Sequence, residues 1–213
     1  YLIASGEHYM LCEPGAMEIF PAVFSAISAH FDARKIETLF SSHQDPDIIS
    51  SLSLWLNFNP DIKCYLSWLW SGFVPHFGGS DETFIKLPDK GMTIEHGNIE
   101  LQALPAHYLH SSGNFNLYDP KAKILFSGDI GAALIPPGED YLFVQDFDSH
   151  IRHAEGFHKR WMGSNEAKNL WCERVSKLDI DMLCPQHGAI FRGPDVKRFI
   201  DWFYSLRVGH IAE

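Results

Sequence analysis

Hydrophobic and polar residues follow two kinds of spacing along the chain, and these predict both strands and helices. Short apolar runs bounded by turn residues predict strands at residues 1–4, 9–12, 36–40, 63–66, 84–87, 92–95, 100–104, 115–118, 124–127 and 182–184. Apolar residues at helical spacing predict helices at residues 17–32, 48–57, 146–160, 165–177 and 194–206. In the first helix, Ile19, Val23 and Ile27 recur at four-residue steps.

The order of these elements predicts a mixed fold. Helices are segregated around groups of strands, which is typical of an α+β protein in which two sheets pack together with helices outside. The sequence contains no internal repeat, charge block or Pro/Gly-rich linker. We therefore expect a single domain over residues 1–213.

Composition excludes several classes of protein. Of the 213 residues, 46% are apolar and 14% are aromatic, which is typical of a chain with a packed core and not of a disordered one. No apolar run reaches the roughly 18 residues that a membrane-spanning helix needs. The net charge is −10 and the 17 Lys and Arg residues are scattered, whereas a nucleic-acid interface needs clustered basic residues. We therefore expect neither nucleic acid nor a membrane as a partner.

The cysteines indicate a reducing compartment. The chain has 4 of them, and no two are spaced as C-x-x-C, so a zinc ribbon or thioredoxin motif is not predicted. We expect reduced, packed thiols in a cytoplasmic protein, without a signal peptide. Because the sequence begins at Tyr1 without Met, the possibility of further domains in a longer native chain stays open.

Candidate chemistry lies in four loops. The chain has 12 histidines, and residues 41–47, 105–110, 126–129 and 185–188 each place a metal-capable side chain just after a predicted strand. Within the first loop, His43, Asp45 and Asp47 alternate, so an extended backbone points all three the same way. One such motif is common by chance, but four in this order predict a metal site.

The remaining histidines and most aromatic residues have a structural interpretation. His76 and His96 lie outside the four loops, and His8, His30 and His210 lie in predicted turn or surface positions. Three histidines of one predicted helix are expected on a solvated or otherwise satisfied surface face: His150, His153 and His158. Core positions are predicted for Trp68, Trp70, Phe73, Phe77 and Phe147, and Tyr108 is expected to line the site.

The order of the four loops resembles the metallo-β-lactamase superfamily, whose motif is H-x-[HED]-x-D-H, then a His, a bridging Asp and a last His. Within it, the chain resembles the diiron domain of flavodiiron proteins and the stand-alone oxygen-binding diiron proteins. Asp45 stands where zinc hydrolases usually carry His, and residues 109–129 and 185–193 are similar to the corresponding flavodiiron segments. The resemblance implies an αββα four-layer sandwich.

The resemblance also implies a ligand set. It places His43, Asp45 and His110 on one metal, Asp47 and His187 on the other, and Asp129 as the bridge. Ile48 stands where the superfamily usually has a further His, which implies a site that is open, filled by water or served by the reserve ligand His107. Asp45 is one methylene shorter than the usual Glu, so it reaches less far toward the metal.

Three histidines and three carboxylates favour iron or manganese over zinc. The cofactor implied by the resemblance is a pair of iron ions with an oxo or hydroxo bridge, with zinc or manganese as alternatives. The implied function is binding of dioxygen or nitric oxide, either as an oxygen-binding or sensing protein or as a reductase-like domain without its flavodoxin. Such a domain would need an external electron donor or a signalling partner, and whether it is an enzyme stays open.

Two other functions stay open. One is a dinuclear zinc hydrolase acting on a thioester, phosphoester or lactam, which Asp45 and Ile48 both argue against. The other is a metal-free interaction domain, for which Ile48 is the sole support.

Overall fold

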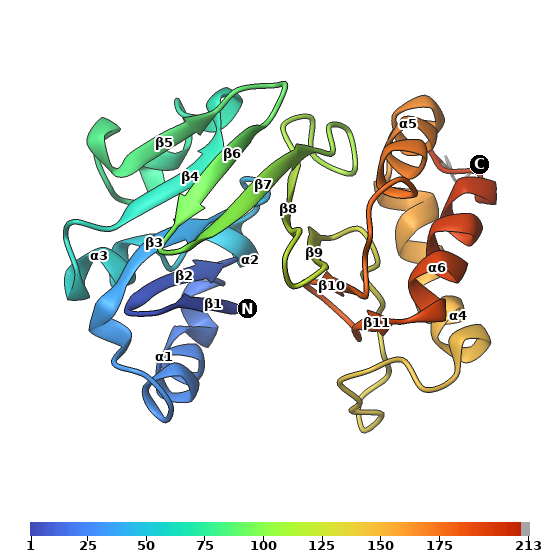
Figure 1. Cartoon of the computed structure of the whole chain (residues 1–213), viewed down its shortest axis with the longest axis horizontal. Coiled ribbons are helices and arrows are strands. Elements are labelled where there is room, and N and C mark those ends of the chain that lie inside the picture. Colours follow the sequence, from blue (N-terminus) through green and yellow to red (C-terminus); the bar gives the residue numbers. More distant parts are fainter. Residues whose placement is uncertain (210–213) are drawn as a thin grey trace. The chain divides into compact units, whose positions relative to one another are not determined.

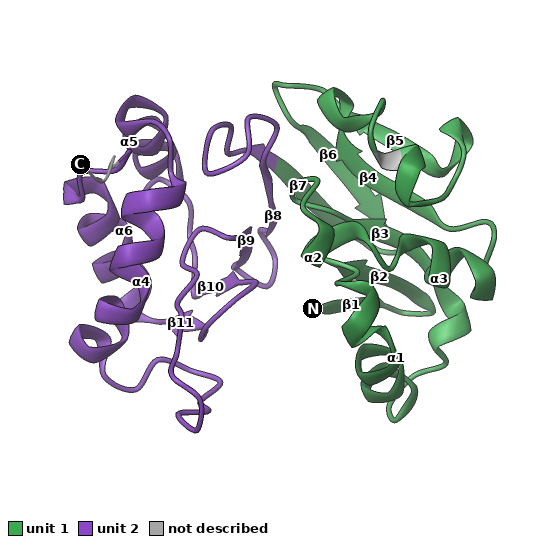
Figure 2. Cartoon of the chain, turned by 180° about the vertical axis from the view of Figure 1, so that it is seen from behind, with its two compact units in different colours: residues 1–103 green, residues 104–213 purple. Residues whose placement is uncertain are grey.

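The computed structural model describes residues 1–209, apart from the side chain of Val74, and the predicted position of His210 lies outside the described residues. The strands form two sheets, and the chain divides into two compact units (Figure 2), residues 1–103 and 104–213. The predicted α+β class is confirmed. No helix within the described residues is long and apolar enough to cross a membrane.

Unit 1 is built on a five-stranded sheet in the order β1-β2-β3-β4-β5 (Figure 1). Its strands are β1 (Leu2–Ser5), β2 (His8–Cys12), β3 (Ile36–Phe40), β4 (Lys63–Ser67) and β5 (Phe84–Leu87). The first two strands form an antiparallel hairpin, and β2, β3, β4 and β5 pair in parallel. A second hairpin follows, made by β6 (Met92–His96) and β7 (Ile99–Pro105).

Aromatic side chains of α1 (Phe20–Ser28) and α3 (Leu52–Phe58), two of the three α-helices of unit 1, pack in its core. The third helix is α2 (Pro46–Ile49), and short 3-10 turns lie at Met17–Ile19, Ala33–Lys35, Trp68–Trp70, Val74–Phe77 and Asp81–Thr83. Trp55 of α3 is fully buried and packs edge-on against Phe20 of α1, with ring centroids 4.9 Å apart. Leu39 of β3 is buried in the same cluster, so the central parallel strand carries the core.

Two predicted helices of unit 1 are shorter than expected. The helix predicted at 48–57 is two helices, because the serines between them bond to another segment instead of continuing one helix. Ser51 Oγ donates to the Pro14 carbonyl at 2.9 Å, and Ser50 Oγ accepts from the Met17 amide at 3.0 Å. The helix predicted at 17–32 begins with a 3-10 turn and is α-helical only over Phe20–Ser28.

In the described part of unit 2, the strands that follow β7 lie in the order β11-β10-β9-β8. They are β8 (Phe115–Asp119), β9 (Ile124–Gly128), β10 (Met182–Pro185) and β11 (Phe191–Arg192). Neighbours pair antiparallel except β9 and β10, which run parallel. All five residues of β8 are buried, as expected for a strand covered on both faces.

Three helices of unit 2 lie side by side (Figure 1): α4 (Phe147–Trp161), α5 (Asn165–Val175) and α6 (Pro194–Ser205). Asp146 and Ser164 cap the N-termini of α4 and α5, where their side chains accept backbone N–H groups. At the C-terminus of α6, the buried Lys168 ammonium donates to the carbonyls of Phe203 and Tyr204. A cation in this position interacts favourably with the carbonyl end of the helix, where the Phe203 carbonyl also accepts from the Leu206 amide at 3.2 Å.

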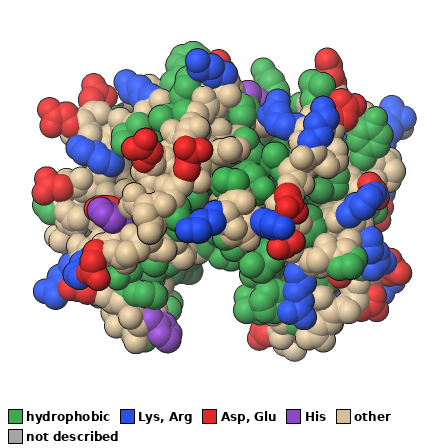
Figure 3. Space-filling view, viewed as in Figure 1, with side chains coloured by type: hydrophobic (Ala, Val, Ile, Leu, Met, Phe, Trp, Pro, Cys, Tyr) green, Lys and Arg blue, Asp and Glu red, His purple; other side chains and the backbone are tan. Residues whose placement is uncertain are grey.

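The distribution of charged side chains and the state of the cysteines agree with what the sequence predicts. On the face shown in Figure 3, Lys and Arg side chains are interspersed with Asp and Glu side chains. All four cysteines are buried, reduced thiols, as predicted. Burial raises the pKa of the Cys64 thiol to about 12, so this thiol stays protonated at neutral pH.

Some predicted core and surface positions are wrong. Trp68 and Phe73 are exposed instead of buried, whereas Phe147 is buried as predicted. His150 and His158 of α4 are buried, although a surface face was expected. The reason is that α4 presents these imidazoles to aromatic rings of other segments: Phe191 lies 5.2 Å from His150, and Phe203 lies 5.1 Å from His158.

The two buried histidines make stability depend on pH. Burial lowers the pKa of both His150 and His158 from 6.5 to about 4, so both are neutral in the folded protein and bind a proton on unfolding. Each therefore contributes stability that is fully present above pH 6.5 and is lost as the pH falls to about 4. We expect a loss of roughly 3 kcal/mol for each histidine over this range, measured by urea unfolding at several pH values.

A single substitution isolates one of these contributions. His150→Phe keeps a buried ring but removes the group that titrates, so the free energy of unfolding of this variant should depend less on pH than that of the wild type. Equal pH dependence in the two proteins would contradict the assignment.

Candidate metal centre

Each candidate loop of the chain follows the end of a strand. His43 comes after β3, His110 after β7, Asp129 after β9 and His187 after β10. Strands β9 and β10 are parallel neighbours whose last paired residues are Gly128 and Pro185. Parallel strands end at the same edge of a sheet, so Asp129 and His187 leave the sheet side by side.

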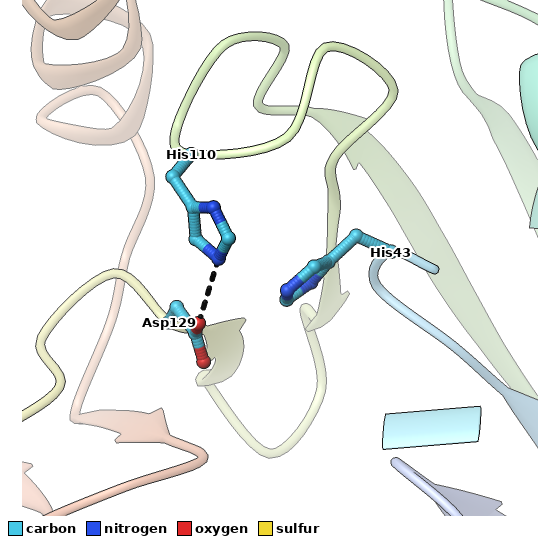
Figure 4. Close-up of side chains that lie close together, drawn as sticks. All are labelled: His43, His110 and Asp129. Atoms are coloured by element: carbon cyan, nitrogen blue, oxygen red, sulfur yellow. Dashed lines mark hydrogen bonds and ion pairs between the residues drawn. The ribbon is translucent and has the colours of Figure 1, made fainter. Parts of the chain in front are cut away.

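In unit 2 the structure brings three of the predicted ligands together: two histidines lie beside the two oxygens of one carboxylate. His110 Nε2 donates to Asp129 Oδ2 at 3.0 Å (Figure 4). On the other oxygen, Asp129 Oδ1 lies 3.8 Å from His187 Nε2. Asp129 and His110 are largely buried, whereas His187 is half exposed. One carboxylate with an imidazole at each oxygen is an arrangement that can bridge two metal ions.

The turn that carries Asp129 is fixed by its own backbone. Ser127 Oγ donates to the Ile130 carbonyl at 2.6 Å, and the Ala132 amide donates to the Asp129 carbonyl at 3.1 Å. The neighbouring loop is tied to it, because the Gln186 amide donates to the Gly128 carbonyl at 2.7 Å. These bonds fix the backbone of the turn that carries Asp129 and hold it against the start of the His187 loop.

Glycine is required where the His187 loop meets the Asp129 loop. Gly188 has a φ of +91°, and a Cβ there would lie 2.9 Å from the Ala133 backbone nitrogen. The Ala133 amide donates to the His187 carbonyl at 3.3 Å, so the two backbones are in contact. A side chain at position 188 would separate them.

The His110 loop is closed by its own hydrogen bonds and walled by aromatic rings. The Ala106 amide donates to the Asn114 carbonyl at 2.9 Å, and Asn114 Nδ2 donates to the Leu109 carbonyl. Two rings of α4 meet the imidazole edge-on, with centroids 6.3 Å (Phe157) and 5.3 Å (Trp161) from that of His110. The ring of His110 is therefore held in one orientation by packing as well as by Asp129.

A buried asparagine ties the strand that precedes Asp129 to a helix. Asn116 of β8 is fully buried, and its Nδ2 donates to the Ser127 carbonyl at 3.0 Å. Its Oδ1 accepts from Trp171 Nε1 of α5 at 2.7 Å. The amide thus satisfies two polar groups that have no access to water.

In unit 1 the three other predicted ligands follow β3. His43, also drawn in Figure 4, is fully buried, and its Nδ1 lies 2.8 Å from Ser42 Oγ. Its Nε2 lies 3.6 Å from Asp45 Oδ2, while Asp45 Oδ1 accepts from Gln44 Nε2 at 2.9 Å. A hydroxyl on Nδ1 orients the ring so that Nε2 can serve as a ligand. Asp47 is exposed in the first turn of α2.

Ile48, which stands where the superfamily usually has a histidine, is part of the packed interior of unit 1. Ile48 is fully buried, and its carbonyl accepts from the Gly15 amide at 2.8 Å. The position that carries a histidine in the superfamily pattern therefore belongs to the packing of unit 1.

The reserve ligand His107 and the pocket candidate Tyr108 line the same cavity of unit 2. The ring of His107 meets Phe115 edge-on at 5.1 Å. His107 and the exposed Tyr108 line a cavity of about 370 Å³ together with Trp171 of α5. A second cavity in unit 2, of about 660 Å³, has His187 in its wall.

Sequence reasoning missed the residues that orient the ligands. Ser42 stands next to His43 in the sequence, so its role as a hydrogen-bond partner of His43 could have been predicted. Phe157 and Trp161 are four residues apart on a helix and hence on one face, but nothing local shows that this face meets His110.

The donor set fits a pair of hard metal ions. Imidazole and carboxylate are the side chains gathered in both units, and such ligands suit iron and manganese at least as well as zinc.

Solved structures of low sequence identity show the class of fold. A mutant of the flavo di-iron protein from Thermotoga maritima is 22% identical, with a TM-score of 0.85 over 96% of this chain and 50% of that chain. Rubredoxin oxygen:oxidoreductase from Desulfovibrio gigas is 20% identical, with a TM-score of 0.87 over 96% and 52%. The chain therefore has a metallo-β-lactamase-like fold, as predicted.

Closer relatives define the family. The family described as "ODP family beta lactamase" matches residues 1–188. The structure described as the peroxy diiron species of chemotaxis sensor ODP is 41% identical, with a TM-score of 0.90 over 98% of this chain and 86% of that chain. The apo state of chemotaxis sensor ODP from T. denticola is also 41% identical, with a TM-score of 0.92 over 98% and 85%. The chain belongs to the ODP family. The comparison with curated proteins gives no match.

The Asn116 amide yields a prediction about stability. Asn116→Leu leaves the Ser127 carbonyl and the Trp171 indole N–H buried without their partner, so it should lower the free energy of unfolding by about 2 kcal/mol or more. Asn169→Leu on α5 is the matched control, since Asn169 Oδ1 has no hydrogen-bond partner among the described residues. Urea unfolding of both variants is the measurement, and equal effects would contradict the role given to Asn116.

Proposed function

We propose that the protein binds dioxygen at a non-heme diiron centre and acts as an oxygen sensor. The observation that carries this proposal is the Asp129 carboxylate, whose two oxygens face His110 and His187. Family membership supports the same conclusion, because the relative at 41% identity is described as a peroxy diiron species of a chemotaxis sensor.

The proposed centre takes ligands from both units. His43, Asp45 and His110 would hold one iron, Asp47 and His187 would hold the other, and Asp129 would bridge them. For these side chains to share one centre, the two units must form a single metallo-β-lactamase-like domain over residues 1–213, which is part of the proposal. With Ile48 in place of the superfamily histidine, Asp47 and His187 would hold their iron with one protein ligand fewer, which would favour binding of a small molecule there.

The protein groups around this centre would have separate tasks. When bound, a ferrous pair supplies the electrons that reduce dioxygen or nitric oxide. Ser42 orients His43, and Phe157 and Trp161 hold the ring of His110. Sustained reduction would require an external electron donor, whereas sensing would require a signalling partner in its place.

Metal analysis tests the proposal directly. We expect about two irons per chain in protein purified without air, and a new absorption band when the ferrous protein meets oxygen. Inductively coupled plasma mass spectrometry and absorption spectra before and after air are the measurements. Two zinc ions, no spectral change and turnover of a thioester or phosphodiester would replace the proposal with the hydrolase.

Substitutions of the ligands test the assignment of residues. Asp129→Ala should lower the iron content at both positions, because it removes the bridge. His187→Ala should leave about one iron per chain, because it removes a ligand of one metal only. His8→Ala, a substitution of a half-exposed histidine of unit 1, is the control and should retain full occupancy. Wild-type iron content in Asp129→Ala would show that the ligand set is wrong.

A further inference from the structure

A buried histidine behind the Asp129 turn uses both ring nitrogens on the backbone. His158 of α4 is fully buried. Its Nδ1 lies 2.8 Å from the Ala154 carbonyl, which can only accept, so Nδ1 carries the hydrogen and donates it. Its Nε2 is then the acceptor for the Gly131 amide, at 2.9 Å. Gly131 is the second residue after Asp129.

The surroundings keep this imidazole neutral and in that tautomer. The rings of Phe157, Phe199 and Phe203 meet it at 5.6, 5.9 and 5.1 Å. Burial among them lowers the pKa of His158 to about 4. A neutral ring with its hydrogen on Nδ1 always presents an acceptor to Gly131.

Gly131 lies in a buried turn beside β10. Gly131 has a φ of +100°, and a Cβ there would lie 3.1 Å from Leu183 and 3.3 Å from Pro185. A residue with a side chain at position 131 would therefore be strained and crowded against β10, so glycine suits this turn. Loss of the acceptor would leave a buried N–H group unpaired, and the turn would have to move to satisfy it.

The same helix also holds the partner of Asp129. Phe157 and Trp161 contact the ring of His110, which donates to Asp129. One face of α4 thus contacts His110 directly and reaches the Asp129 turn through His158 and Gly131.

We infer that His158 is a positioning residue for the proposed metal centre: its Nε2 holds the Gly131 amide and so directs the Asp129 carboxylate toward His110 and His187. The inference rests on the proposed function only in that Asp129 is taken as a metal ligand. A positioning role differs from a packing role because it requires a hydrogen-bond acceptor at residue 158, and not merely a ring of the right size.

Two substitutions separate these roles. His158→Phe keeps a buried ring but has no acceptor. His158→Gln places an amide oxygen near the position of Nε2 and can still accept from Gly131. His150→Phe is the matched control, because it replaces another buried histidine of α4 whose Nδ1 bonds to Tyr141 and not to the Asp129 turn.

The first measurement is made without metal, by nuclear magnetic resonance of amide hydrogen exchange. The Gly131 amide should exchange about tenfold or more faster in His158→Phe than in the wild type, because it has lost a buried hydrogen bond. His158→Gln and His150→Phe should leave its rate near that of the wild type.

The second measurement is titration with Co²⁺ in the absence of air, followed by absorption. His158→Phe should weaken Co²⁺ binding by about tenfold, the low end of the loss for a direct outer partner of a ligand, and alter the spectrum, because His158 acts on Asp129 only through the Gly131 backbone. His158→Gln should restore affinity and spectrum, and His150→Phe should not change them.

The outcomes distinguish this inference from the proposed function. If His158→Gln is as impaired as His158→Phe, or if His158→Phe matches the wild type in both measurements, the positioning role is wrong. If the wild type binds no metal, the proposed function fails, and the exchange rate of Gly131 alone decides whether His158 holds the turn.

Discussion

The candidate centre in unit 2 depends on the parallel pairing of β9 and β10. Because both strands end at the same edge, the residues that follow them leave the sheet together. Asp129 and His187 therefore face each other within one or two residues of the strand ends, and no long loop is needed to bring them together. The backbone bond between Gln186 and Gly128 holds the two loop starts at a fixed separation. The Asp129 carboxylate can then meet a histidine at each oxygen, and the chemistry of the site follows from that geometry.

Much of this arrangement could be predicted because it is local. Strand ends can be recognised from apolar runs that stop at turn residues, and the predicted strands of unit 2 differ from the observed ones by one residue at most, apart from the short β11. The metal-capable residues His110, Asp129 and His187 lie in sequence directly after such ends. The grouping around Asp129 needs only the additional fact that β9 and β10 are neighbours.

What could not be predicted depends on contacts between distant segments. The helix α4 carries enough polar residues to look like a surface helix, yet aromatic side chains of β11 and α6 bury His150 and His158. Conversely, Trp68 looks like a core residue, but its indole N–H donates to Asp89 at 2.6 Å and the ring stays half exposed. In both cases a partner far along the chain decides burial, and spacing within one element carries no signal of it.

The position of Trp161 beside His110 makes its fluorescence sensitive to a metal ion bound at that histidine. Its indole is 55% exposed on one side and meets the ring of His110 on the other. An open-shell metal ion on His110 would lie close enough to this ring to quench its emission by electron or energy transfer. The chain therefore carries a fluorophore within contact of the candidate ligand, and occupancy of the site could be followed by light without any added label.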